Sequence, residues 1–125
     1  MQKNMIRKNI YPIEDIFKLL RASINHNSKY IILDDEQVHA DSQRYKVFMN
    51  YGCTCCECGL QAKYFALERF SDQNRYHLNL YGIKDGKEIL FTKDHIIPKS
   101  KGGKDRLDNY QTMCIICNNR KADIM

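Results

Sequence analysis

Long apolar runs are absent from this chain of 125 residues, because no hydrophobic stretch approaches the roughly 20 residues that a membrane helix needs. Residues 1–17 carry charges and have no apolar core followed by small residues, so they do not resemble a secretory signal. Internal repeats and low-complexity tracts are also absent. With 43% hydrophobic and 28% charged residues, the composition is typical of a globular rather than a disordered protein. We therefore expect one cytoplasmic globular unit that neither spans a membrane nor is secreted.

Cysteine is missing from most of the chain and is confined to two short clusters, at 53–58 and 114–117. A disulfide framework usually spreads its cysteines along a short secreted chain, so this distribution favours a metal site. Each cluster contains two cysteines separated by two residues, and this spacing lets a turn direct both thiolates at one ion. Two such pairs complete a tetrahedral zinc site, which we predict to consist of Cys55, Cys58, Cys114 and Cys117.

The first cluster allows a second register, because Cys53 and Cys56 are also separated by two residues. We prefer the pair of Cys55 and Cys58, since Gly59 follows it directly and can adopt the left-handed conformation of a zinc knuckle. In this register Cys53 and Cys56 are neighbours of the site that bind no zinc.

Acidic residues are outnumbered, and most of the basic excess lies in the second half of the chain. The whole chain has 20 basic and 15 acidic residues, a net charge of +5. Residues 1–62 contain 8 basic and 7 acidic residues, or +1, whereas residues 63–125 contain 12 and 8, or +4. A basic half suggests a polyanionic partner, most commonly nucleic acid, although charge that only maintains solubility would give the same count.

The spacing of apolar residues in the first half predicts two helices and a short strand. After Pro12, apolar residues recur at intervals of three and four and form one helical face. This face consists of Ile13, Ile16, Phe17 and Leu20. We expect helices over residues 12–25 and 42–51, the second ended by Gly52, and a strand over 30–33 that ends at the polar residues 34–36.

Alternating apolar residues and turn signals predict strands in the second half. Asp85-Gly86 is a hairpin signal, and the Lys- and Gly-rich residues 99–104 indicate a loop. We expect strands over 63–70, 76–81 and 89–92, a helical turn over 107–110, and a helix from near Cys117. We further expect residues 1–51 to form an accessory helix–strand–helix layer on a zinc-centred module of residues 52–125, the two making one compact unit.

Polar residues between and beside the cysteine pairs suggest a hydrolytic site. Asp94 and His95 follow a predicted strand, Asn109 lies fourteen residues after His95, and Asn118 and Lys121 follow the second cysteine pair. A carboxylate and a carboxamide oxygen can hold a hard cation such as Mg²⁺ next to a phosphodiester. A neutral imidazole can take the proton from an attacking water, and an oxygen on its other nitrogen fixes its tautomer.

Residues 53–59 and 92–121 resemble the HNH nucleases, which carry a ββα-metal (His-Me finger) active site. The resemblance is carried by the cysteine pair before Gly59, by Asp94-His95-Ile-Ile-Pro with its Gly-Gly loop, by Asp-Asn109, and by Cys-Ile-Ile-Cys-Asn118-Asn-Arg-Lys. It implies an α+β fold: a small zinc-stabilised ββα-metal module, here with an N-terminal helix/strand extension. It also implies that the four-cysteine zinc is structural.

The resemblance implies a role for each matching polar residue. His95 takes the place of the general base, and Asp94 and Asn118 take the places of the ligands for a catalytic Mg²⁺ or Mn²⁺. Asn109 takes the place of the asparagine that orients the histidine and ties the loop. The last motif position is an asparagine rather than a histidine, and Asn119 replaces Asn118 as ligand if the helix begins one residue later. About 35 residues separate Gly59 from Asp94, an insert that we expect to form an extra hairpin.

Cations around these motifs are candidates for binding the phosphates of nucleic acid. They are Lys99, Lys101, Lys104, Arg106, Arg120 and Lys121. A solvated basic loop is the alternative explanation for the first four.

Together, these patterns predict a metal-dependent HNH endonuclease that hydrolyses DNA, with RNA as a further possible substrate, acting as a monomer or a homodimer. The alternative is a non-catalytic zinc module that binds nucleic acid or a protein. An intact set of Asp94, His95, Asn109 and Asn118 favours the enzyme, because a binding module has no need of it.

Overall fold

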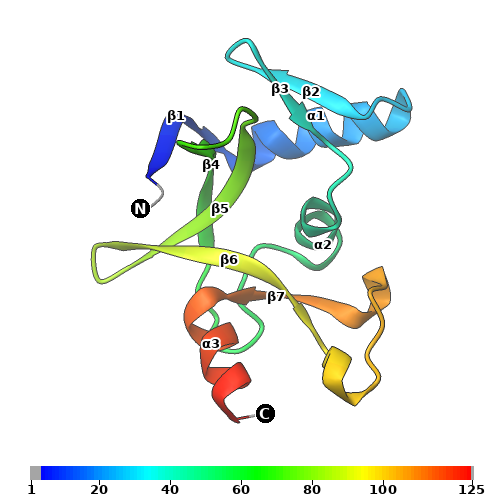
Figure 1. The fold of residues 1–125 in the computed structure, drawn as a ribbon, viewed down its shortest axis with the longest axis vertical. Helices are drawn as coiled ribbons and strands as arrows, with labels where there is room; N and C mark the ends of the chain where they lie inside the picture. Colours follow the sequence, from blue (N-terminus) through cyan, green and yellow to red (C-terminus); the bar gives the residue numbers. More distant parts are fainter. Residues whose placement is uncertain (1–3, 125) are drawn as a thin grey trace. The chain divides into compact units, whose positions relative to one another are not determined.

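The computed structural model describes residues 4–124 (Figure 1). Contacts divide the chain into two compact units. Of the described residues, the first unit contains 4–42 together with 63–80, and the second contains 43–62 together with 81–124. Each unit is therefore built from two separate stretches of chain. Among the described residues, no helix is both long and apolar enough to cross a membrane.

The first unit contains β1 and β4, which pair in antiparallel fashion, the first part of β5 beside β4, helix α1, and a hairpin of β2 and β3. The register runs from Met5 opposite Phe70 to Pro12 opposite Tyr64, with a bulge after Arg7. The element bounds are β1 Met5–Pro12, α1 Ile13–Asn25, β2 Tyr30–Leu33, β3 Glu36–His39, β4 Ala62–Phe70 and β5 His77–Lys84.

Helix α1 has the apolar face that its sequence predicts. Ile16, Phe17 and Leu20 are buried, and the Phe17 ring meets the Phe65 ring of β4 edge-on at 5.9 Å between centroids. Pro12 is the N-cap residue, and the acidic Glu14 in the first turn complements the positive end of the helix dipole. The predicted helix is confirmed, because its apolar spacing matches the period that one buried face requires.

The polar stretch at 34–36 is a hairpin turn rather than a simple end of β2. Asp34 and Asp35 both have positive φ angles, 46° and 64°, as the central residues of a tight two-residue turn require. The chain then returns along β2 as β3, which the sequence did not predict. Strand β1 was also not predicted, because most of its side chains are exposed and no alternation of burial marks it.

The second unit contains the ββα arrangement expected from the resemblance. Strands β6 (Lys87–His95) and β7 (Tyr110–Cys114) pair in antiparallel fashion, and α3 (Ile115–Ile124) packs against both (Figure 1). Helix α2 (Gln43–Tyr51) also packs against β6 and β7, and Gly52 ends it with a φ of 95°. The α+β fold class and the small ββα module with a four-cysteine cluster are therefore confirmed.

Three details of this unit differ from the expectations. Strand β6 extends to His95, so the Asp-His pair belongs to the strand itself. The helical turn at Leu107–Asn109 is present, but it leads into β7, which was not predicted. Helix α3 begins at Ile115, two residues before the expected start at Cys117, so Asn118 lies in its first turn. Strand β7 was not predicted because its five residues are too few to show a clear alternation of apolar and polar side chains.

Candidate metal centre and active site

The sulfur atoms of the four predicted zinc ligands converge in the second unit. All four lie within 4.8 Å of one another, and the Sγ atoms of Cys58 and Cys114 are 3.9 Å apart. Tetrahedral zinc with Zn–S bonds of about 2.3 Å places sulfur atoms about 3.8 Å from one another, so the spacing fits this metal. Cys53 and Cys56 lie outside the cluster, as the preferred register predicts. The cluster consists of Cys55, Cys58, Cys114 and Cys117.

The local backbone explains how the first pair reaches this position. Residues 53–62 form a small hairpin in which Cys55 N donates to Leu60 O at 2.8 Å and Gly59 N donates to Cys55 O at 3.0 Å. Gly59 has a φ of 79°, the left-handed conformation that its place after the pair predicts. This hairpin therefore has the features of a zinc knuckle. The second pair comes from the junction of β7 and α3.

Electrostatics supports a cation among these thiols. Burial opposes the charged form of Cys55, but backbone N–H groups of Cys114, Cys58 and Glu57 counteract burial and lower the pKa of Cys55 to about 6. Burial and the neighbouring sulfur atoms raise the pKa of Cys117. Four thiolates this close repel one another unless a divalent cation compensates their charge. The cluster therefore indicates a structural zinc site.

Asp94 is buried near the end of β6, with only 7% of its surface exposed. Its Oδ2 accepts hydrogen bonds from Gln111 Nε2 at 2.9 Å and from Lys121 Nζ at 2.7 Å. Gln111 lies opposite Asp94 in the β6–β7 register, and Lys121 lies on α3. The Lys121 ammonium also donates to the carbonyl oxygen of His95 at 2.6 Å. This lysine therefore holds the end of β6 to α3 and neutralises the Asp94 carboxylate.

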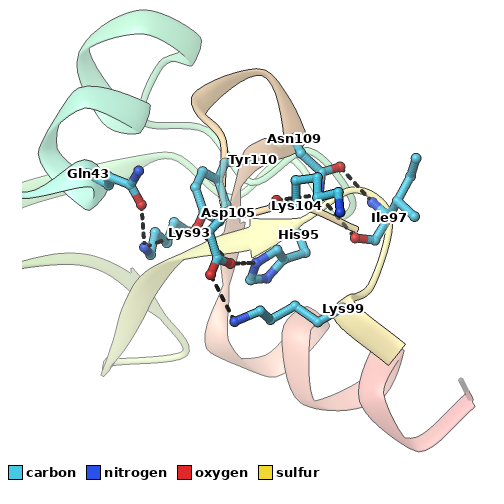
Figure 2. A network of polar contacts seen from close by, with 9 residues as sticks. All are labelled: Gln43, Lys93, His95, Ile97, Lys99, Lys104, Asp105, Asn109 and Tyr110. Carbon is cyan, nitrogen blue, oxygen red and sulfur yellow. Dashed lines mark hydrogen bonds and ion pairs between the residues drawn. The ribbon is translucent and has the colours of Figure 1, made fainter. Parts of the chain in front are cut away.

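The His95 side chain faces a carboxylate that the sequence did not single out. His95 Nε2 lies 2.7 Å from Asp105 Oδ1, and Lys99 Nζ lies 2.8 Å from Asp105 Oδ2 (Figure 2). The Tyr110 hydroxyl also donates to Asp105 at 3.3 Å, and the His95 and Tyr110 rings lie 4.8 Å apart. Hydrogen bonds from Lys99 and, to a smaller extent, from His95 lower the pKa of Asp105 to about 2. Asp105 is therefore an ionised acceptor beside the imidazole at neutral pH.

Asn109 ties together the two ends of the loop that follows β6. Its Oδ1 accepts from Ile97 N at 2.9 Å, and its Nδ2 donates to Ile97 O at 3.1 Å and to Lys104 O at 2.9 Å (Figure 2). The carbonyl oxygen of Asn109 also accepts from Ile96 N at 2.8 Å. The amide side chain thus spans the loop, and the direct partner of the His95 ring is Asp105.

Asn118 lies in the first turn of α3 and contacts β6. Its Nδ2 donates to Thr92 Oγ1 at 2.8 Å, which fixes the amide and assigns its nitrogen to this side. Within the described residues, Asn118 Oδ1 and Asp94 Oδ1 accept no hydrogen bond. Both side chains line one cavity of about 480 Å³. Its lining consists of Asp94, His95, Pro98, Lys99, Ser100, Asn118, Lys121 and Ala122.

The candidate phosphate-binding cations fall into two groups. Lys99, Lys121 and Arg106 form ion pairs with Asp105, Asp94 and Asp108, respectively. The remaining three are exposed and form no ion pair within residues 4–124; they are Lys101, Lys104 and Arg120. Of all six, Lys99 and Lys121 line the cavity.

Some residues around the site could not be found from sequence spacing. Gln111 and Tyr110 meet Asp94 and His95 because β7 pairs with β6, so a prediction of β7 with its register would have found them. Asp105 lies ten residues after His95 in an irregular loop, where no periodic signal applies. These contacts come from the pairing of strands and from the closure of the loop.

Gly103 is required by close packing inside this loop, and its replacement is a sharp test of loop geometry. A β-carbon at Gly103 would overlap the carbonyl oxygen of Ile97 and lie 2.9 Å from that of Pro98. We expect Gly103→Ala to destabilise the second unit by about 1–3 kcal/mol, because the backbone must shift. The comparison is Gly102→Ala, whose β-carbon meets open space but whose φ is 89°. Thermal unfolding of both variants and of the wild type checks this; a wild-type melting temperature for Gly103→Ala would contradict the close-packing argument.

Comparison with known proteins gives one match. Residues 82–123, about one third of the chain, match the family model described as HNH endonuclease. No curated protein and no solved structure matches the chain. The family match supports a nuclease-type function in general terms. Because the matched residues include the Asp-His pair of β6, Asn109 and the second cysteine pair, the resemblance to the HNH endonucleases is confirmed for residues 82–123.

Proposed function

We propose that this protein is a metal-dependent endonuclease that hydrolyses phosphodiester bonds of DNA. The observation that supports this most is the cavity in the second unit that is lined by Asp94, His95, Asn118 and Lys121 together. These side chains come from the end of β6 and from α3, which the ββα arrangement holds against each other. A carboxylate, an imidazole, a carboxamide and an ammonium in one cavity are the groups that phosphodiester hydrolysis requires.

His95 is the proposed general base. Its side chain is 28% exposed and lines the cavity, so it can reach a water molecule beside a bound phosphate. The imidazole takes a proton from this water as the water oxygen bonds to phosphorus and the bond from phosphorus to the leaving oxygen breaks. Lys121 supplies positive charge at the same wall of the cavity, where it can stabilise a phosphate oxygen.

Asp94 and Asn118 are the proposed ligands for the catalytic cation. Each has an oxygen that accepts no hydrogen bond among the described residues, and both line the cavity. Carboxylate and amide oxygens are suitable donors for Mg²⁺ or Mn²⁺, so the residues fit such an ion. When bound, the ion would polarise the scissile phosphate and stabilise the charge on the leaving oxygen.

The substrate class follows from the charge around the cavity. Lys101, Lys104 and Arg120 are exposed cations in the same unit and are available to neutralise phosphates of a polynucleotide. One site in each chain suggests that a monomer nicks one strand, whereas a pair of chains is needed to cut both.

Supercoiled plasmid tests this function. Purified protein is incubated with plasmid in Mg²⁺, in Mn²⁺ and without added divalent ion, under conditions that leave the structural zinc bound. We expect nicked plasmid only when Mg²⁺ or Mn²⁺ is present, because Asp94 and Asn118 alone do not polarise the phosphate. Single-stranded and duplex RNA are parallel substrates. Equal cleavage with and without divalent ions would contradict the proposed mechanism.

A non-catalytic zinc module that binds nucleic acid is the second candidate, and one observation favours it. The Lys121 ammonium lies 2.7 Å from Asp94 Oδ2, so the carboxylate already has a positively charged partner. A pure binding module would retard DNA in a gel shift without divalent ions and cleave none of the substrates. Cleavage that depends on Mg²⁺ or Mn²⁺ would exclude this alternative.

A further inference from the structure

The loop that follows β6 carries a carboxylate beside the proposed base. His95 Nε2 and Asp105 Oδ1 are 2.7 Å apart, a short distance typical of a charge-assisted hydrogen bond. Lys99 holds the other carboxylate oxygen at 2.8 Å, so Asp105 is fixed from two sides (Figure 2). Asn109 holds the backbone of Lys104, the residue directly before Asp105. The position of Asp105 is therefore set by the loop closure.

The chemistry of this contact determines the tautomer of a neutral His95. An ionised carboxylate can only accept hydrogen bonds, so Nε2 must carry the hydrogen. The lone pair of the neutral ring then belongs to Nδ1. Asp105 does not line the cavity, whereas His95 does, so we expect Asp105 to affect catalysis through the imidazole.

We propose that Asp105 is a positioning residue for His95: its Oδ1 holds the hydrogen on Nε2, and Nδ1 is thereby left to take the proton from water. This inference rests on the proposed nuclease function. It also explains the hydrogen bonds that Asn109 makes across the loop, since they hold Asp105 next to the imidazole. It also links Lys99 to the base, because one carboxylate binds both side chains.

The exposure of Asp105 limits the loss of activity that its replacement should cause. Its side chain is 51% exposed, so water competes for the hydrogen bond and replaces part of it after mutation. Loss of a partner that orients a metal-binding histidine commonly reduces metal affinity or activity about 10- to 100-fold, and we expect a similar range for the proposed base. A fully buried partner of a catalytic histidine costs far more, about 10⁴-fold when the wrong tautomer results. We therefore expect the smaller range here.

Asp105→Asn tests the proposal, with Asp108→Asn as the matched control. Asp108 lies in the same loop, is exposed, and pairs with Arg106 rather than with His95, so both variants change the charge by the same amount. We expect Asp105→Asn to lower kcat about 10- to 100-fold with KM changed by less than about threefold. Asp108→Asn keeps the wild-type kcat. An unchanged kcat in Asp105→Asn, or an equal loss in both variants, overturns the proposal.

Two further variants separate positioning from a general structural effect. Asp105→Glu retains a carboxylate and should recover part of the lost kcat. Asp105→Asn added to His95→Ala should cause no further loss, because Asp105 acts only through the imidazole. Losses that multiply in the double variant would instead show that Asp105 acts independently of His95.

A measurement that does not depend on cleavage tests this inference separately from the proposed nuclease function. Long-range ¹H–¹⁵N spectra at about pH 8, above the usual histidine pKa, report which nitrogen of His95 carries the hydrogen. We expect the Nε2–H tautomer in the wild type and in Asp108→Asn, and a mixture in Asp105→Asn. If the wild type cleaves no substrate but this pattern holds, the nuclease proposal fails while the assignment of Asp105 to the tautomer stands. The same tautomer in all three proteins overturns the assignment.

Discussion

Replacement of His95 by alanine should strongly reduce metal-dependent cleavage and leave the fold intact. The loss should be about 10²- to 10⁴-fold in kcat, the range for removal of a general base. The fold should survive because the His95 side chain is partly exposed and because Asp105 keeps its ion pair with Lys99. No buried charge is thus left without a partner. Plasmid nicking under single-turnover conditions measures the loss, and thermal unfolding with zinc content verifies the fold.

The matched control for this variant is His26→Ala. His26 is an exposed histidine that follows α1 in the first unit, and its backbone N–H, which alanine retains, makes the helix-capping bonds. This variant should cleave at the wild-type rate. Cleavage by His95→Ala at the wild-type rate would show that another group accepts the proton. An unfolded His95→Ala protein would mean that this histidine is needed for folding, and the kinetic test would then use Asp105→Asn alone.

Replacement of Cys114 by serine should remove zinc from the second unit and unfold it. Structural zinc contributes about 10 kcal/mol or more of apparent folding free energy, which exceeds the stability of most domains of this size. Cys114 is buried at the end of β7, so its replacement removes the one ligand of the cluster that β7 supplies. Zinc content by mass spectrometry and amide dispersion for β6, β7 and α3 in ¹H–¹⁵N spectra measure the effect.

Cys56→Ser is the matched control for the zinc site. Cys56 belongs to the same cluster in the sequence but is exposed and lies outside the group of four sulfur atoms. The Cys56→Ser variant should retain one zinc ion in each chain and the wild-type melting temperature. Full zinc content in Cys114→Ser, or loss of zinc in Cys56→Ser, would contradict the ligand set.

The parts of the molecule that were predictable depend on neighbours in the sequence. The zinc pairs were predictable because two ligands two residues apart are aimed by a single turn, and Gly59 supplies the conformation of that turn. Helix α1 was predictable because one apolar face repeats along 13 residues. The pair Asp94-His95 was identified by a motif, and the family match covers it.

The parts that were not predictable depend on residues brought together from separate segments. Strand β1 has little alternation of burial, and its pairing with β4 defines it. Strand β7 has five residues and becomes visible through its pairing with β6, which places Gln111 opposite Asp94. Asp105 reaches His95 because Asn109 closes an irregular loop, and loop closure leaves no periodic trace in a sequence.

The amino-acid sequence alone specified the chemistry of this protein: the four thiols, the Asp-His pair, the asparagines and the basic second half. These features are local, since residue type and short spacing decide which ligands and which charges are present. The tertiary structure decided which of these groups act on one another. The Lys121 side chain contacts Asp94, and the Asp105 side chain contacts His95, because β6 pairs with β7, α3 packs against them and the loop closes. A hydrogen bond of less than 3 Å requires two groups to be close in space, and the spacing of residues in a sequence does not specify that.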